Sequence, residues 1–255
     1  MVARRIVFAV GVLLAASLGG VLAVRAQSAA GTTRLVAKPV FHVQKPAVVV
    51  RPEKARARGT LVAQVLPGRV VDVRSGPAGA VVARLTSRTE FGSPRTFAVT
   101  RDGAGRGYAV ITTELPNGRR GWVDAGTGAL RLSHSPVTLD VDLSSRLLRV
   151  HSGDRVLRTM RVGIGAEGSP TPTGRFAITD ELRGSAYSSA YGCCILALSG
   201  HQTNLPRGWT GGDRLAIHGG STVGAVSAGC LHAATADLLY LMRSVPLGTQ
   251  VVIHP

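Results

Sequence analysis

Cysteine, lysine, acidic residues and aromatic residues are all scarce in this chain of 255 residues. Three cysteines cannot form a disulfide framework, which excludes a small scaffold held together by several disulfide bonds. Only 17% of the residues are charged, whereas 45% are hydrophobic, and this balance excludes a disordered chain because a core can form. Aromatic residues make up 4% of the chain and glycines number 32, a composition that favours short strands and tight turns over long helices.

The positive charge is concentrated before residue 59. The formal net charge is +16; residues 1–31 contribute +3 of it and residues 32–58 a further +6, which leaves +7 for the rest. Residues 31–58 hold Lys-Pro and Arg-Pro pairs without hydrophobic periodicity, so we predict a semi-extended basic linker there. No nucleic-acid recognition motif accompanies the charge, which argues against nucleic acid as a partner. An anionic envelope polymer fits the linker better, and a solvated spacer without a partner fits equally well.

An uncharged apolar segment of nineteen residues, 6–24, follows Arg4 and Arg5. A basic start, an apolar stretch and small residues afterwards are typical of a secretory signal peptide. The stretch is also just long enough to span a bilayer as an uncleaved signal anchor. We therefore predict a signal peptide or signal anchor at residues 1–30, with membrane contact through this segment alone. Either form places the rest of the chain outside the cytoplasm, in the cell wall or at the outer face of the cytoplasmic membrane.

Short strands separated by turns are predicted in residues 59–132, and their spacing predicts a small β-barrel domain. The strand candidates lie at residues 61–65, 70–73, 80–85, 96–100, 108–111 and 121–124. Residues 71–77, followed by residues 121–123, resemble a bacterial SH3-like domain, and such modules often bind cell-wall peptides. After residues 133–136 the pattern restarts in a second domain.

The second domain, residues 136–255, is predicted to be mainly β with one or two helices. Its predicted strands lie at residues 137–141, 147–150, 156–164, 175–179 and 249–253. The first two of these form a predicted hairpin. Residues 236–244 have clear helical periodicity, with Thr235 as the expected N-cap.

Two residues near the end of the chain are candidates for nucleophilic catalysis. Cys230 follows Gly229, so its backbone has room to approach a substrate, and His218 ends a short apolar strand that would hold the imidazole rigidly. A cysteine nucleophile needs a base for its proton and donors for the developing oxyanion. The spacing by itself also fits a buried inert thiol and a surface histidine.

The sequence around both residues resembles the L,D-transpeptidase (YkuD) catalytic domain. That family's signature is a His-Gly, a loop, and then Ser/Thr-His-Gly-Cys with an apolar residue. Here His218-Gly219 precedes Ser-Ala-Gly-Cys-Leu at residues 227–231. The resemblance spans about residues 136–254 and implies a YkuD-like β-sandwich. Further similar segments are the Thr-Pro-Thr-Gly-Arg-Phe turn at 171–176, the approach to the histidine at 211–219, and the terminal helix and strand at 237–253.

The resemblance implies a role for each residue of the site. Cys230 would be the nucleophile, and His218 would accept and donate the proton. The carbonyl of Gly219 would orient the imidazole, Ser227 would help to fix the loop, and the amides of Gly229 and Cys230 would form part of the oxyanion hole. No cofactor or metal is implied, and a carbapenem is expected to acylate Cys230.

The reaction that the resemblance implies is peptidoglycan L,D-transpeptidation in cell-wall biogenesis. Cys230 would attack the carbonyl of the third residue of a donor stem peptide and expel the terminal D-Ala. An amine of an acceptor stem peptide would then resolve the thioester and form a 3→3 crosslink.

Three features depart from the family pattern. Ala228 stands where the family usually has a second histidine, and His232 stands where arginine or asparagine is common. Only eight residues separate His218 from Ser227, fewer than is usual. We expect His232 to open a helix and to be solvated, and we expect the shorter loop to alter the acceptor side of the site.

Cys193 and Cys194 are adjacent, so their Cα atoms are about 3.8 Å apart, closer than disulfides usually allow. We predict two unbonded small residues at the start of a strand. The alternative is a bridge from one of them to Cys230, which would silence the enzyme under oxidation.

Other functions stay open on the sequence. Water in place of the acceptor amine would give an L,D-carboxypeptidase or another hydrolase on the same site. A decayed catalytic domain would leave a non-catalytic cell-wall-binding protein, with the first domain as its working part. A structural zinc site at His218, Cys230 and His232 is the least favoured, because such a site needs four ligands.

Overall fold

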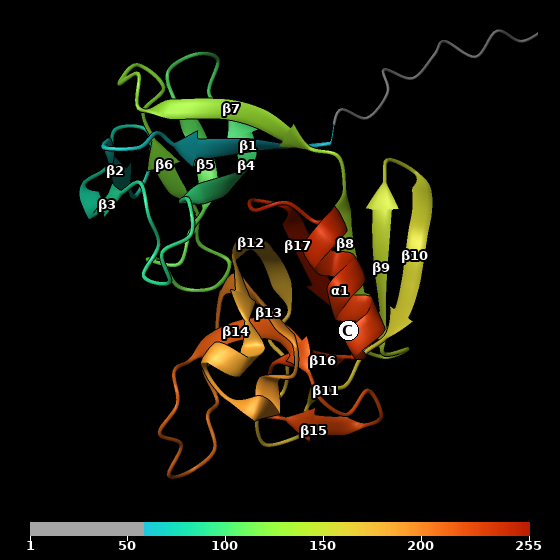
Figure 1. Cartoon of the computed structure of the whole chain (residues 1–255). Coiled ribbons are helices and arrows are strands. Elements are labelled where there is room, and N and C mark those ends of the chain that lie inside the picture. The colour runs from blue at the N-terminus through green and yellow to red at the C-terminus, as the bar shows by residue number, and fades with distance from the viewer. Residues whose placement is uncertain (1–58) are drawn as a thin grey trace, which may run out of the picture. The chain divides into compact units, whose positions relative to one another are not determined.

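The computed structural model describes residues 59–255, which form short strands joined by turns (Figure 1). The predicted signal or anchor segment (1–30) and the predicted basic linker (31–58) lie outside the described residues. Within the described part, α1 (Thr235–Ser244) is the one α-helix, beside the 3-10 helices η1 (Gly184–Ala186) and η2 (Ser189–Tyr191). The prediction of a mainly β chain with one or two helices is therefore confirmed. No helix among residues 59–255 has the length and apolar character needed to cross a membrane.

The first half of the described chain forms a seven-stranded sheet with the order β3-β2-β6-β5-β4-β1-β7. Its core consists mostly of small and branched side chains, such as the fully buried Ala63, Val73 and Val110, together with the aromatic rings of Phe97 and Tyr108. The SH3-like assignment of this half stays a prediction. The strands are β1 (Thr60–Val65), β2 (Val70–Arg74), β3 (Val81–Thr86), β4 (Thr96–Asp102), β5 (Tyr108–Ile111), β6 (Gly121–Val123) and β7 (Leu130–Ser135).

Strand β7 is the one element of this sheet that the sequence does not predict, and its last residues, 133–135, fall in the predicted junction between the domains. Four of its six residues are exposed, so it shows no hydrophobic alternation. The strand forms because its backbone pairs with β1 along its whole length, from Thr60 opposite Ser135 to Val65 opposite Leu130. The change of sheet falls between β7 and the next strand, close to the predicted boundary at residue 136.

The second half forms an eight-stranded sheet with the order β10-β9-β8-β17-β12-β13-β14-β16. The inner strand β13 is buried at seven consecutive residues, which is typical of a strand covered on both faces. The pair β11·β15 is a separate two-stranded parallel sheet. The strands are β8 (Thr138–Asp142), β9 (Leu147–Ser152), β10 (Arg155–Arg161), β11 (Ile164–Gly165), β12 (Gly174–Arg183), β13 (Cys194–His201), β14 (Arg214–Gly219), β15 (Ala225–Ser227), β16 (Leu231–Ala233) and β17 (Gln250–His254).

Two predicted strands have different bounds in the structure. The strand predicted at 156–164 is divided into β10 and β11, since β11 leaves β9 and pairs with β15. The strand predicted at 175–179 continues to Arg183, because its polar end keeps pairing with β13. The predicted hairpin of β8 and β9 is confirmed.

Helix α1 packs its apolar stripe against β13 and β14, with Leu238 and Leu241 fully buried. The expected capping by Thr235 is wrong: Ala234 is the N-cap, without a side-chain hydrogen bond, and Thr235 is already helical. The first turn is instead tied to β10, because both Nε and Nη2 of Arg158 donate to Oδ1 of Asp237, at 2.9 and 2.6 Å. The Asp237 carboxylate also has a favourable position near the positive end of the helix dipole.

Candidate active site

The two segments that carry His218 and Cys230 are neighbours in the sheet. Strands β14 and β16 are parallel, with His218 opposite His232, and Cys230 directly precedes β16. Because side chains alternate along a strand, the side chains of Ala216, His218 and His232 lie on one face, and the same alternation carries Cys230 to that face. His218, Cys230 and His232 all line one cavity of about 580 Å³. The sequence-predicted pair is therefore brought together.

The His218 imidazole is held in one orientation. It is 7% exposed, and its Nδ1 lies 2.8 Å from the carbonyl oxygen of Gly219. A carbonyl can only accept a hydrogen bond, so Nδ1 carries the proton and Nε2 is left with a free lone pair. Burial lowers the pKa of His218 to about 4. The ring is therefore neutral around pH 7 and able to take a proton at Nε2.

The Cys230 thiol lies over the backbone of β14. Its Sγ is 3.9 Å from the carbonyl oxygen of Arg214, to which the thiol donates. Burial raises the pKa of Cys230, and a hydrogen bond from the backbone of Ala216 opposes that rise. Cys230 is consequently a neutral thiol at rest, and it needs a base to become a nucleophile.

The loop before Cys230 is fixed by Ser227. Its hydroxyl donates to the carbonyl oxygen of Cys230 at 2.6 Å and accepts the backbone N–H of Gly229 at 3.1 Å. The Gly229 amide, expected in the oxyanion hole, is thus engaged by Ser227. No acceptor for the Cys230 amide is found among residues 59–255, which leaves that N–H as the available donor for an oxyanion.

His232 does not open a helix, contrary to expectation. It is the central residue of β16 and is partly buried, because that strand pairs with β14 on one side. Its ring centroid is 4.7 Å from that of His218. Burial lowers the pKa of His232, and its Nδ1 is buried without a hydrogen-bond partner in the described part of the chain. The site therefore contains two adjacent neutral imidazoles.

Three further residues belong to the site: Arg214 lies in the segment 211–219 that resembles the family's approach to the histidine, whereas no motif marked Tyr191 and Gln202. Tyr191, in η2, packs edge-on against His218 with ring centroids 4.8 Å apart. Arg214 supplies the carbonyl that accepts the Cys230 thiol. Gln202 contacts the loop before Cys230 through the carbonyl of Ala228, at 3.1 Å. Tyr191 and Gln202 lie far from the catalytic motif in sequence, so periodicity and spacing gave no signal for them.

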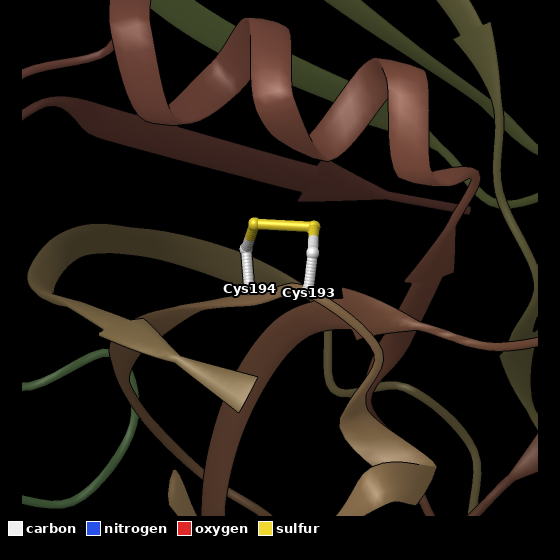
Figure 2. Close-up of a disulfide and its surroundings, with 2 residues drawn as sticks. All are labelled: Cys193 and Cys194. Atoms are coloured by element: carbon white, nitrogen blue, oxygen red, sulfur yellow. A yellow bond between two sulfur atoms is a disulfide. The ribbon is translucent and has the colours of Figure 1, made fainter. Parts of the chain in front are cut away.

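Cys193 and Cys194 are joined by a disulfide, as Figure 2 shows, and Cys230 is a free thiol. The prediction of two unbonded cysteines is therefore wrong, and the alternative bridge to Cys230 is not formed. Cys193 still lies in the turn that precedes β13, and Cys194 is the first residue of the strand. The alternation that sends neighbouring side chains to opposite faces has not begun there, which lets the two side chains meet.

The described residues offer no metal-binding cluster. Among residues 59–255, no three side chains of His, Cys, Asp or Glu are grouped so that they would hold a metal ion.

Comparisons with known proteins point to one family. Residues 136–253 match YkuD, the L,D-transpeptidase catalytic domain. The L,D-transpeptidase YkuD of Bacillus licheniformis is 32% identical over 126 residues, which are 47% of this chain and 67% of that protein. The Bacillus subtilis protein of the same name is 29% identical over 125 residues, 47% of this chain and 66% of its own length. A solved L,D-transpeptidase from Mycobacterium smegmatis is 15% identical, with a TM-score of 0.40, and the match covers 62% of this chain and 82% of that one.

Proposed function

Because the chain belongs to the YkuD family of L,D-transpeptidase catalytic domains, we propose that it is an exported, cysteine-dependent peptidoglycan L,D-transpeptidase. Its substrates are donor and acceptor stem peptides, and its product is a 3→3 crosslink. The observation that carries the proposal is the hydrogen bond from Nδ1 of His218 to the carbonyl oxygen of Gly219. This hydrogen bond fixes the tautomer in which Nε2 is the base. His218 lies on β14, and β14 pairs with β16, the strand that begins directly after Cys230.

Acylation begins with a neutral thiol and a neutral imidazole. Nε2 of His218 takes the proton of Cys230 as Sγ attacks the carbonyl carbon of the third stem residue. The tetrahedral oxyanion receives a hydrogen bond from the backbone N–H of Cys230. The intermediate collapses to a thioester when His218 returns the proton to the nitrogen of the departing D-Ala.

Deacylation reverses the proton path. An amine of the acceptor stem peptide attacks the thioester carbonyl, and Nε2 of His218 accepts a proton from that amine. The C–S bond then breaks, the new amide is released, and the proton returns to Sγ of Cys230. If water takes the place of the amine, the same steps give the L,D-carboxypeptidase or hydrolase alternative. Both routes need neutral His218, which its lowered pKa provides.

Export and location at the cell wall rest on the N-terminal sequence. The apolar residues 6–24 behind Arg4 and Arg5 are typical of an export signal or anchor, and an extracytoplasmic site is where peptidoglycan is available. The basic linker would bring the chain to anionic envelope polymers.

Intact-protein mass spectrometry of the full chain with a carbapenem tests the proposal, with Cys230→Ala as control. We expect one adduct per wild-type chain and none on the variant, because Cys193 and Cys194 are bonded to each other and do not compete. Donor and acceptor stem peptides then separate crosslinking from trimming by the mass of the product. A folded wild-type protein with a free Cys230 thiol and no adduct would overturn the proposal in favour of a non-catalytic wall-binding protein.

A further inference from the structure

Gln202 lies directly after β13, in the loop that leads to β14. Its side chain is only 5% exposed although it is polar. Its backbone N–H donates to the carbonyl oxygen of Asp213 at 2.6 Å, and its Oε1 accepts the backbone N–H of Asn204 at 2.9 Å. These contacts fix the side chain at the wall of the cavity that contains Cys230.

The amide nitrogen of Gln202 faces three backbone carbonyls from two separate segments. Nε2 lies 3.2 Å from the oxygen of Ser169, 3.0 Å from that of Pro170 and 3.1 Å from that of Ala228. The first two belong to the turn after β11, and the third belongs to the loop before the nucleophile. Only a group that donates hydrogen bonds satisfies this end of the side chain, because every partner of Nε2 is an acceptor.

Gly229 touches the same amide. Its φ is +114°, and a Cβ at this position would lie 2.0 Å from Nε2 of Gln202. Glycine is therefore required at 229 both by the backbone conformation and by the space that Gln202 fills.

The peptide between Ala228 and Gly229 is consequently held at both ends. Its carbonyl oxygen accepts from Gln202, and its N–H donates to Ser227 at 3.1 Å. Because a peptide unit is planar, these two hydrogen bonds fix the orientation of the plane. The next peptide carries the N–H of Cys230, and its direction follows from the plane before it.

We propose that Gln202 is a positioning residue for the transfer reaction: it holds the Ala228–Gly229 peptide so that the N–H of Cys230 is aimed at the oxyanion. The inference rests on the proposed function, since it concerns the oxyanion of the acyl-transfer step. Gln202 touches neither the substrate nor Sγ in this role. It acts through the loop that carries the nucleophile.

Two reactions of Cys230 distinguish this role from a merely structural one. Acylation by a carbapenem passes through an oxyanion, whereas alkylation by iodoacetamide needs the thiolate but no oxyanion. For the full chain with Gln202→Met, which keeps the volume but removes the donors, we expect the acylation rate constant to fall about 100-fold. The carbapenem concentration that gives the half-maximal acylation rate should stay within about threefold of the wild-type value, and so should the rate of alkylation. Thr203→Met, at the exposed neighbouring position, is the matched control and should behave as wild type.

A second variant keeps the test decisive if the Met variant folds poorly. Gln202→Glu places a carboxylate against three carbonyls, so its acylation should be slow near pH 8. When the carboxyl is protonated it regains one donor, and its acylation relative to wild type should rise as the pH falls towards about 5. Equal losses in acylation and alkylation, or unchanged acylation in both variants, would overturn the role of Gln202 while leaving the proposed function intact. Absence of acylation in the wild type would overturn both.

Discussion

His218 and His232 face each other across the paired strands β14 and β16, with ring centroids 4.7 Å apart. Two imidazoles this close cannot both carry a proton without repulsion. The repulsion adds to burial, which is the larger cause of the low pKa of His218. The His218 imidazole, the proposed base, is thus kept neutral by its desolvation first and by its neighbour second.

Replacing His232 should raise the pKa of His218. For His232→Asn, the acidic limb of the pH profile of acylation is expected to move upward from its wild-type position near pH 4, by less than about one unit because burial remains. The measurement is the carbapenem acylation rate constant as a function of pH. His134→Asn, at an exposed position far along the sequence, should leave the limb where it is. A limb that stays or moves downward in His232→Asn would contradict the coupling.

Lowering the pH should destabilise the protein through His218, because the unfolded chain takes up a proton on this imidazole at a higher pH than the folded protein does. In the unfolded chain the imidazole binds its proton near pH 6.5, whereas in the folded protein its pKa is about 4. The unfolded state therefore gains protons first as the pH falls through this window, and stability is lost there. Across this window His218 should account for a loss of about 3 kcal/mol in the free energy of unfolding. Urea unfolding at several pH values measures this loss. His218→Asn should flatten this part of the curve, and an equally steep decline in that variant would contradict the assignment.

Gly229→Ala should damage both folding and activity. A non-glycine residue at φ +114° costs about 1–3 kcal/mol, and the new methyl group would also collide with Nε2 of Gln202. We expect a loss of unfolding free energy in that range and at least about a tenfold slower acylation, measured by urea unfolding and by mass spectrometry. Gly168→Ala is the control, because nothing lies within 4 Å of a Cβ there. Similar effects of both substitutions would rule out the collision as the cause.

One free thiol per chain is expected in the oxidised protein. Cys193 and Cys194 are bonded, and Cys230 is free, so titration with a thiol reagent after unfolding without reductant should give one thiol. After reduction the count should rise to three, the total in the sequence. Cys230→Ala should lower both counts by one. Three thiols before reduction, or none, would contradict the pairing.

The sequence predicted the elements whose pattern is set by burial, such as the alternating strands β2 and β8 and the apolar stripe of α1. It missed β7, because four of that strand's six residues are exposed and only its pairing with β1 makes it a strand. The prediction for Cys193 and Cys194 was wrong because the turn that brings their side chains together depends on local geometry rather than on Cα spacing.

The candidate site was predicted as far as it lies in the two segments with recognisable motifs. His218 and Cys230 could be identified because both belong to such segments. Gln202 could not, because its importance comes from hydrogen bonds to residues 33, 32 and 26 positions away along the chain, where no periodic pattern operates. His232 was expected in a helix because the short strand β16 depends on long-range pairing, with β14 on one side and with Gly163 on the other.

Backbone pairing, rather than the connecting loop, sets the distance between the segments that carry His218 and Cys230. Neighbouring strands lie about 4.8 Å apart whatever joins them, so residues 220–226 have only to close the connection between β14 and the nucleophile segment. A change in the length of this stretch would therefore leave the imidazole and the thiol on neighbouring segments. The eight residues between His218 and Ser227 can thus be fewer than in the family pattern while the sheet still holds the imidazole next to the segment that carries the thiol.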